Sequence, residues 1–151
     1  MAFPFVEENS ESKRRLETLV RGLSDEDLTR SSSDGWTVAA LLAHLAFWDQ
    51  RVLVLLRRWK EKGVDFSPVD ADAVNDALQP LCRVMPPRTA VELCLSSAEI
   101  VDAALETVTA DLVQQIEASG THFRFNRALH RDDHLRQIER LLGRHAGPGS
   151  A

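Results

Sequence analysis

The clearest pattern in the chain is a run of apolar positions that follows Trp36 and Thr37. The apolar side chains recur at alternating intervals of three and four residues, at Val38, Leu41, Leu45, Trp48, Val52, Leu55 and Trp59. This spacing is typical of a helix that packs lengthwise in a helical bundle. Thr37 is a suitable N-cap, and Gly63 is a suitable residue after the last turn. The pattern therefore predicts a long helix that ends near Lys62–Gly63.

Another helix is predicted before this one. It begins near Asn9 or Ser10, either of which can cap it, and its apolar face carries Leu16, Leu19, Val20 and Leu23. The run Ser24–Asp27 has the form of a helix cap with acidic residues in the first turn. A polar segment at 31–35, with three serines and a terminal Gly35, then interrupts the helical pattern.

Two more long helices are predicted in the second half of the chain. The third long helix follows Pro86–Pro87 and continues to a break at Ser119–Gly120. Its apolar stripe consists of Val91, Leu95, Ala98, Val101, Leu105, Val108 and Leu112. The fourth covers approximately Asn126 to Arg144.

The connection between the second and third long helices is less regular. The run Asp70–Leu78 predicts a short helix, and Pro80 punctuates the segment that follows. A connection of this length indicates a long crossover or an ordered lid, because bare loops of such length are uncommon. Together the four long helices predict an all-α four-helix bundle. They form a single domain at 1–146, followed by a flexible tail at 147–151.

The composition supports a helical domain and excludes several classes of partner. Aromatic residues make up only 6% of the 151 residues and tyrosine is absent, which argues against a strand-rich fold. With 18 basic and 23 acidic residues the net charge is −5, so neither nucleic acid nor an anionic membrane surface is an expected partner. The apolar stretches contain His44, Asp49 and Arg51, so no membrane span is predicted. The N-terminus does not resemble a signal peptide, and Cys82 and Cys94 fit structural thiols, so a cytoplasmic protein is expected.

Three of the five histidines form a set at helical spacing. His130 and His134 lie four residues apart, on the face of the last helix that also carries Ile138 and Leu141. His44 lies at the edge of the apolar seam of the second long helix. Buried imidazoles are costly unless their nitrogens are satisfied, and one divalent cation would satisfy all three. Neutral histidines that are hydrogen-bonded in the core are the alternative that the spacing leaves open.

The other polar candidates near this set have weaker patterns. His122 and His145 are predicted to be solvated, the first in a loop and the second at the end of the last helix. Asp49 lies about 140° around the helix from His44, so it is not assigned as a general base.

Two motifs and their order resemble those of the DinB/YfiT-like metalloenzymes. The run Gly35–Leu45 is similar to the segment that opens the second helix of that family, where Trp and Ser or Thr precede an apolar stretch and a His-Leu pair. The run His130–Ile138 is similar to the family's second motif, HxxxH followed by Gln-Ile. Asp72–Asn75 resembles an acidic-apolar-Asn stretch that many members carry between the second and third long helices. The order, the separations and the chain length match over nearly the whole domain.

The resemblance implies up-down-down-up connectivity, which agrees with the long connection between the second and third long helices. It also implies a divalent metal ion, nickel or zinc, bound by His44, His130 and His134, with Asn75 as a polar contact near the site. Members form homodimers and include thiol-dependent transferases, isomerases and hydrolases of reactive electrophiles. The resemblance therefore leads us to expect a homodimer and a low-molecular-weight thiol as co-substrate.

The leading hypothesis is a metal-dependent enzyme that acts on a small-molecule electrophile by thiol transfer or hydrolysis. Three neutral imidazoles leave one or more metal positions open, as in catalytic rather than structural sites. One alternative is a non-catalytic bundle that binds or sequesters a small molecule. The other is a metal-free dimeric interaction module whose histidines are core residues. No residue is assigned as a general base.

Overall fold

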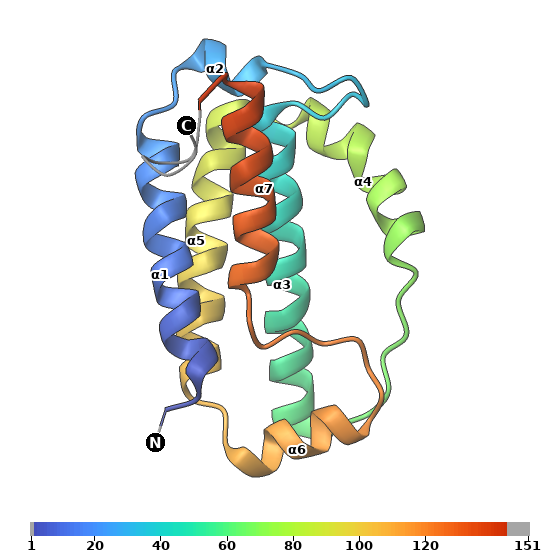
Figure 1. Ribbon diagram of the computed structural model, residues 1–151. Helices are drawn as coiled ribbons and strands as arrows, with labels where there is room; N and C mark the ends of the chain where they lie inside the picture. Colours follow the sequence, from blue (N-terminus) through green and yellow to red (C-terminus); the bar gives the residue numbers. More distant parts are fainter. Residues whose placement is uncertain (1, 145–151) are drawn as a thin grey trace.

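A computed structural model describes residues 2–144, and within this range the chain is all α-helical, with seven helices and no named strand. Four long helices lie side by side in Figure 1: α1 (Pro4–Arg21), α3 (Val38–Lys62), α5 (Pro87–Glu106) and α7 (Ala128–Leu141). Three shorter helices lie in the connections: α2 (Asp25–Thr29), α4 (Ala71–Val84) and α6 (Ala110–Ala118). The all-α prediction is confirmed for this range. His145, the expected domain end at 146 and the expected tail at 147–151 lie outside the described residues.

The core of the protein is built around α3. This helix packs most extensively on α5 and also contacts α4 and α7. Most of its apolar side chains, among them Leu42, Leu45 and Leu56, are almost completely buried. By length and composition α3 could cross a membrane, but 72% of the window that meets this criterion is buried inside the protein. Such burial is expected of a helix at the centre of a core.

The caps of α3 confirm its predicted bounds. Thr37 accepts a hydrogen bond from the backbone N–H of Ala40 at 3.0 Å. At the other end Gly63 has φ 87°, a left-handed conformation that favours glycine. The predicted cap before α2 is also present, because Ser24 and Asp27 exchange side-chain-to-backbone hydrogen bonds at 3.0 and 3.1 Å. Local signals are sufficient to locate both helix starts.

The predicted start of the first helix is wrong, since α1 begins at Pro4 rather than near positions 9 and 10. Proline is favoured in the first turn of a helix, where its missing N–H would have no helical partner. The ring of Phe5 stacks on Phe3 and Phe125 at centroid distances of 5.1 and 5.4 Å, which anchors the extra turns. Asn9, expected to cap the helix, is instead buried within it and donates to the carbonyl of Phe125 at 2.9 Å.

The third long helix is divided in two, so the prediction of one continuous helix up to Ser119–Gly120 is wrong. The second part, α6, lies across the end of the long helices in Figure 1. Thr109 begins it by accepting a hydrogen bond from the N–H of Leu112 at 3.1 Å. Val108 and Leu112 nevertheless pack on the same apolar cluster as the end of α5. The apolar period therefore continues through the break, which explains why periodicity did not reveal it.

α4 is longer than the predicted short helix, because it continues past Leu78 and through Pro80. Proline in a helix leaves the carbonyl four residues earlier without a partner. That carbonyl belongs to Asp76, and both Asp76 and Pro80 are exposed, so water can satisfy it. Asp70 stabilises the start of α4 by accepting a hydrogen bond from Ala73 N at 3.1 Å. α4 therefore forms an ordered helix beside α3 within the long connection.

The last helix is shorter at both ends than the predicted Asn126–Arg144. The side chain of Asn126 accepts a hydrogen bond at 2.9 Å from the N–H of Ala128, the first residue of α7. It thus satisfies a donor that has no partner within the helix, and the helix begins after it. At the other end Gly143 has φ 69°, which no longer continues a right-handed helix.

Candidate metal centre

α3 and α7 bring three histidines together at one point. His44 on α3 is only 5% exposed, whereas His130 and His134 lie one turn apart on α7 and are half-buried. The Nε2 atom of His130 lies 3.1 Å from that of His44 and 3.2 Å from that of His134. The three nitrogens all lie within 4.8 Å of one another. The structure thus assembles all three histidines that the sequence singled out.

The separations between these nitrogens fit the ligands of a tetrahedral metal ion. Zinc–imidazole bonds are about 2.0–2.1 Å long, so two such ligands at the tetrahedral angle are about 3.3–3.4 Å apart. The observed 3.1 and 3.2 Å are close to this value. Hydrogen bonds alone do not explain both contacts, because one Nε2–H on His130 can donate to only one of its two neighbours. The donor set is therefore compatible with a divalent transition metal ion.

Gln137 orients one of the three imidazoles. Its Oε1 atom lies 3.0 Å from Nδ1 of His134. Because this oxygen can only accept, the proton of the neutral ring resides on Nδ1, and Nε2 presents its lone pair to the other histidines. Gln137 follows the HxxxH motif and had no predicted role, although its three-residue spacing from His134 places both side chains on one face of the helix.

Two tryptophans and Asn75 surround the ring of His44. Trp36 and Trp48 meet this ring edge-on, at centroid distances of 5.4 and 6.5 Å. The indole N–H of Trp48 donates to Oδ1 of Asn75 on α4 at 3.0 Å. Asn75 is half-buried and lines the same small chamber as His44 and His130. α4 therefore contributes a polar side chain to the surroundings of the histidines.

Burial keeps the three imidazoles neutral at ordinary pH. It lowers the pKa of His44 to about 4 and that of His130 to about 2, with smaller contributions from neighbouring histidines and, for His130, nearby arginines. Burial also lowers the pKa of His134, although its hydrogen bond to Gln137 opposes the shift. Neutral imidazoles offer the lone pairs that metal binding requires.

A chamber of 180 Å³ adjoins the histidines between α3, α4 and the loop before α7. Its lining includes three arginines, Arg51, Arg124 and Arg127, and among the described residues no carboxylate lines it. His122 is exposed, as predicted, and also lines the chamber. No sequence pattern predicted these arginines as site residues, because they come from a helix and a loop more than seventy positions apart.

Beside the histidines lies a buried cluster of charges, here called the ion-pair clamp: Asp49, Asp102, Arg127 and Arg131. Arg131 donates to both oxygens of Asp102, at 2.9 and 2.7 Å, and to Asp49 at 3.3 Å. Arg127 donates to the other oxygen of Asp49 at 2.9 Å. The four side chains are only 1–6% exposed. The clamp joins α7 to α3 and α5, so it fixes the part of α7 that carries His130.

The clamp also explains the role of Asp49. This carboxylate faces the two arginines, in agreement with the decision not to assign it as a base for the histidine site. Burial lowers the pKa of Arg131, but hydrogen bonds and charges from Asp102 and Asp49 outweigh it and raise that pKa. The sequence did not reveal this network, because the residues that form its ion pairs are 29 to 82 positions apart.

The two cysteines are not part of the histidine centre. Both Cys82 and Cys94 are free and buried, as expected of structural thiols. Burial raises the pKa of both thiols, that of Cys94 to about 12, so they stay protonated and unreactive at neutral pH.

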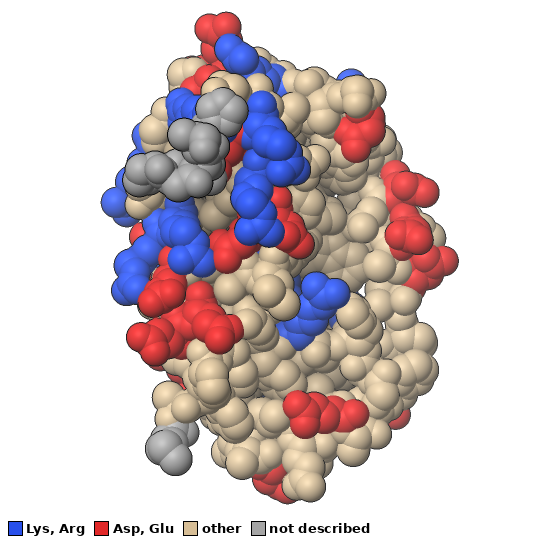
Figure 2. Space-filling model, in the orientation of Figure 1, with Lys and Arg blue, Asp and Glu red and all other residues tan. Residues whose placement is uncertain are grey.

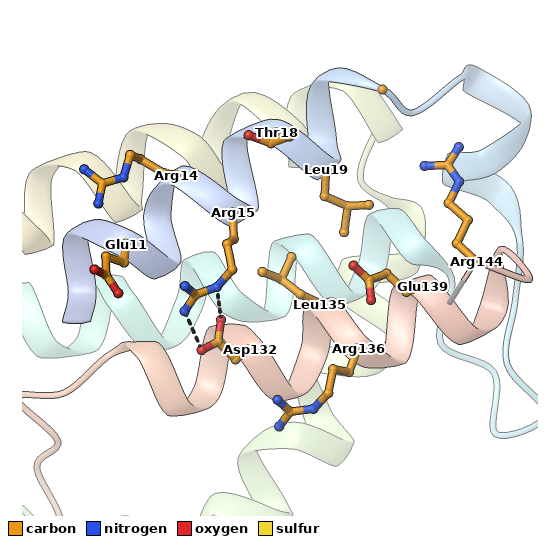
Figure 3. A pocket seen from close by; sticks show the side chains of 11 residues that line it. Glu11, Arg14, Arg15, Thr18, Leu19, Asp132, Leu135, Arg136, Glu139 and Arg144 are labelled. Carbon is orange, nitrogen blue, oxygen red and sulfur yellow. Dashed lines mark hydrogen bonds and ion pairs between the residues drawn. The ribbon is translucent and has the colours of Figure 1, made fainter. Parts of the chain in front are cut away.

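A larger groove of 810 Å³ runs between α1 and α7 (Figure 3). Arg15 spans it and donates to both oxygens of Asp132, at 3.1 and 2.8 Å. The other charged side chains that line the groove also include both acidic and basic residues, and Figure 2 shows the two signs mixed over this face of the protein. Because these charges compensate one another and none of its described lining residues is a histidine, the smaller chamber is the better candidate site.

Comparison with known proteins agrees with the two motifs. A family model described as the DinB superfamily matches residues 8–143. No curated protein and no solved structure matches the chain. The matched range contains the three histidines, Asn75 and the whole ion-pair clamp.

Proposed function

The chain belongs to the DinB superfamily, and we propose that it is a divalent-metal-dependent enzyme that acts on a small electrophile by thiol transfer or hydrolysis. The observation that carries this proposal is the convergence of three neutral imidazole nitrogens beside a small chamber. Three imidazoles leave at least one position of a tetrahedral ion free, which is the arrangement of catalytic rather than structural sites.

The proposed frame is the up-down-down-up four-helix bundle of the family. Its support is the direction of the chain in Figure 1, where α1 and α7 run upward and α3 and α5 run downward. α3 and α5 are consecutive long helices that run in the same direction, so the chain must return along the length of the bundle between them. The segment that contains α4 makes this return.

In this proposal His44, His130 and His134 bind nickel or zinc, for both of which imidazole is a suitable ligand. The ion supplies Lewis-acid activation of a thiol or water. Gln137 keeps Nε2 of His134 free of a proton, and the clamp holds α7 in place. Trp48 orients Asn75, whose amide N–H groups are then available to the substrate.

Of the two reactions, thiol transfer has the better support. The chamber lining includes no carboxylate among the described residues, so the chain offers no Asp or Glu as a general base for water there. A thiol needs less assistance, because its pKa is far lower than that of water. In the transfer the sulfur forms a bond to the electrophilic carbon, the leaving group departs with its bonding electron pair, and the thiol proton passes to solvent.

The direct test is the metal content of protein produced without a polyhistidine tag. We expect about one divalent ion per chain, and loss of that ion in the His130→Ala and His134→Ala variants. His122→Ala is the matched control, because His122 is exposed and outside the three-histidine group. Folded protein without metal, even after addition of nickel or zinc, would contradict the proposal and favour the metal-free interaction module.

Turnover separates the enzyme from a binding protein. The metal-loaded protein is assayed with a panel of low-molecular-weight thiols and alkylating or epoxide electrophiles, with the His134→Ala variant as background. Product formation that depends on both metal and thiol supports thiol transfer, and formation that depends on metal alone supports hydrolysis. Stoichiometric metal without any turnover would instead favour the non-catalytic, small-molecule-binding bundle.

We also propose a cytoplasmic homodimer. Two buried, free cysteines are typical of a reducing compartment. Exposed apolar side chains recur at intervals of seven residues, Phe47 and Val54 on α3 and Leu93 and Ile100 on α5, so that each helix presents an apolar stripe to solvent. Light scattering of the purified protein tests the dimer, and the double variant Val54→Glu, Ile100→Glu should dissociate it.

A further inference from the structure

The chamber beside the histidines concentrates positive charge in a protein that is acidic overall. The chain carries a net charge of −5, yet three arginines and no carboxylate among the described residues line this space of 180 Å³. Acidic side chains gather elsewhere on the surface, for example over α4 in Figure 2. Such a pocket attracts an anion, because charges of one sign inside a concave surface reinforce one another.

Arg127 presents an unused donor to this chamber. Its residue is only 4% exposed, and Asp49 neutralises its charge through a hydrogen bond to Nε at 2.9 Å. Nη1 donates to the carbonyl of Arg124 at 3.4 Å, whereas Nη2 has no hydrogen-bond partner among the described residues. A buried guanidinium that lines a cavity with a free N–H group is suited to bind a ligand oxygen.

Arg51 is held by two backbone carbonyls and carries a charge that no described carboxylate compensates. Backbone carbonyls of His122 and Ser67 accept hydrogen bonds from its Nη1 and Nη2 at 3.3 and 3.2 Å. No acidic side chain in the described part of the chain forms an ion pair with it. Burial and the charge of Arg127 lower its pKa, which shows that its surroundings disfavour the cation. A bound anion would remove this penalty.

Arg124 adds an exposed charge at the edge of the chamber. Its side chain is exposed and, like that of Arg51, forms no ion pair with the described residues. The chamber therefore holds one buried donor, one fixed uncompensated guanidinium and one exposed guanidinium. Guanidinium groups bind carboxylates through paired, charge-assisted hydrogen bonds.

We propose that the chamber binds the carboxylate of a small organic acid, with Arg51 and Arg127 as its fixed donors and Arg124 closing over it. The inference rests on the proposed function in one respect: it makes the electrophilic substrate a carboxylic acid, whose reactive carbon faces the histidines. A volume of 180 Å³ corresponds to roughly six water molecules, so the part of the acid that enters is a short chain of a few carbons.

The test compares butyrate with butyramide, a neutral molecule of nearly the same shape, by NMR titration of isotopically labelled protein. The indole N–H of Trp48, which lines the chamber, reports on binding. We expect butyrate to shift this signal and butyramide to leave it unchanged. Arg51→Gln and Arg124→Gln should each weaken butyrate binding, about tenfold for the fixed Arg51. Arg58→Gln, an exposed arginine on the same helix outside the chamber, should bind as the wild type does.

Titrations before and after treatment with a chelator separate the arginine site from direct binding to a metal ion. Butyrate binding that needs Arg51 in both preparations supports the inference. Equal binding of butyrate and butyramide, binding that ignores both arginine substitutions, or tighter arginine-dependent binding of inorganic phosphate than of butyrate would overturn it. Stoichiometric metal without arginine-dependent binding would refute the carboxylate site alone, whereas arginine-dependent binding in a chain that takes up no metal would refute the proposed function alone.

Discussion

Two buried clusters meet at consecutive residues of α7, and their chemistry is opposite. His130 faces His44 of α3, with three imidazoles pressed together and no counter-charge among them. Arg131, the next residue, faces Asp49 and Asp102, where every formal charge has an opposite charge within hydrogen-bond distance. Both clusters join α7 to α3, but in the clamp each charge has an opposite charge, whereas in the histidine cluster neutral ring nitrogens face one another.

The difference separates a cluster that stabilises the fold from one that is prepared for a ligand. In the clamp every carboxylate oxygen accepts a hydrogen bond from an arginine, and Nε of Arg131 is the one fully buried side-chain atom without a partner among the described residues. Nη1 of Arg131 also donates to the backbone carbonyl of Asn9 at 3.2 Å. In the histidine cluster the nitrogens approach one another, and Nδ1 of His44 is buried without a partner. A group of lone pairs that face one another at 3.1–3.2 Å is stabilised by a cation between them.

The largest expected effect comes from opening the clamp. Arg131→Met removes the buried counter-charge of Asp102 and leaves Asp49 paired with Arg127 alone, which should lower the free energy of unfolding by about 3–5 kcal/mol. Urea denaturation measures this loss. The control is Arg15→Gln. It breaks the exposed ion pair between Arg15 on α1 and Asp132, the residue after Arg131 on α7, and should lower the free energy of unfolding by less than about 1 kcal/mol. Equal losses of unfolding free energy in the two variants would show that the buried clamp contributes no more to stability than an exposed ion pair.

The histidine cluster should make the metal-free protein sensitive to mild acid. Unfolded histidines take up protons below a pH of about 6.5, whereas burial holds the folded pKa of His44 at about 4 and that of His130 at about 2. Between pH 6.5 and 4 the unfolded state therefore binds more protons, and the free energy of unfolding falls as the pH is lowered.

Urea midpoints of chelator-treated protein at pH 7, 5.5 and 4 measure this dependence. A His44→Phe variant should show a weaker dependence over the same range, because it lacks one of the groups that titrate differently in the two states. Identical slopes for the variant and the wild type would contradict this assignment of the acid sensitivity.

Metal should stabilise the fold through the histidines and leave the clamp unchanged. An ion that binds only the folded protein adds about 2.7 kcal/mol when its free concentration is 100 times its Kd. We therefore expect zinc or nickel to raise the Tm of the wild type and a chelator to reverse the gain. In Arg15→Gln the gain should persist, and in His134→Ala it should be lost. An unchanged Tm on addition of zinc or nickel, in wild-type protein shown to be folded, would contradict the proposed binding site.

The smallest expected effect concerns the orientation of one ligand. Gln137→Leu removes the acceptor on Nδ1 of His134 and should weaken metal affinity about 10–100-fold, with little change in metal-free stability. Competition with a metal-binding dye measures the affinity. Arg140→Gln, at an exposed position of the same helix, is the matched control. Unchanged affinity in Gln137→Leu would show that this hydrogen bond does not orient the ligand.

Local signals predicted much of the fold and the three central histidines. The caps of α3 were read from Thr37 and Gly63, because capping is an interaction between residues a few positions apart. The spacing of His130 and His134 placed both on one face for the same reason. A local signal was misleading where a distant contact competed with it. Asn9 suits a helix cap, but in the structure it lies within α1 and its side chain donates to the backbone carbonyl of Phe125.

The sequence by itself determined the all-helical class, the central helix and the membership in the DinB superfamily, since these depend on periodicity, capping and motifs that short stretches of chain carry. The tertiary structure alone decided what surrounds the histidines. Arg127 and Asp49 are 78 residues apart, and Arg131 and Asp102 are 29 residues apart on different helices. Such pairs have no period, because packing of helices rather than the helical repeat brings them together. The charge of the chamber depends on the same long-range packing.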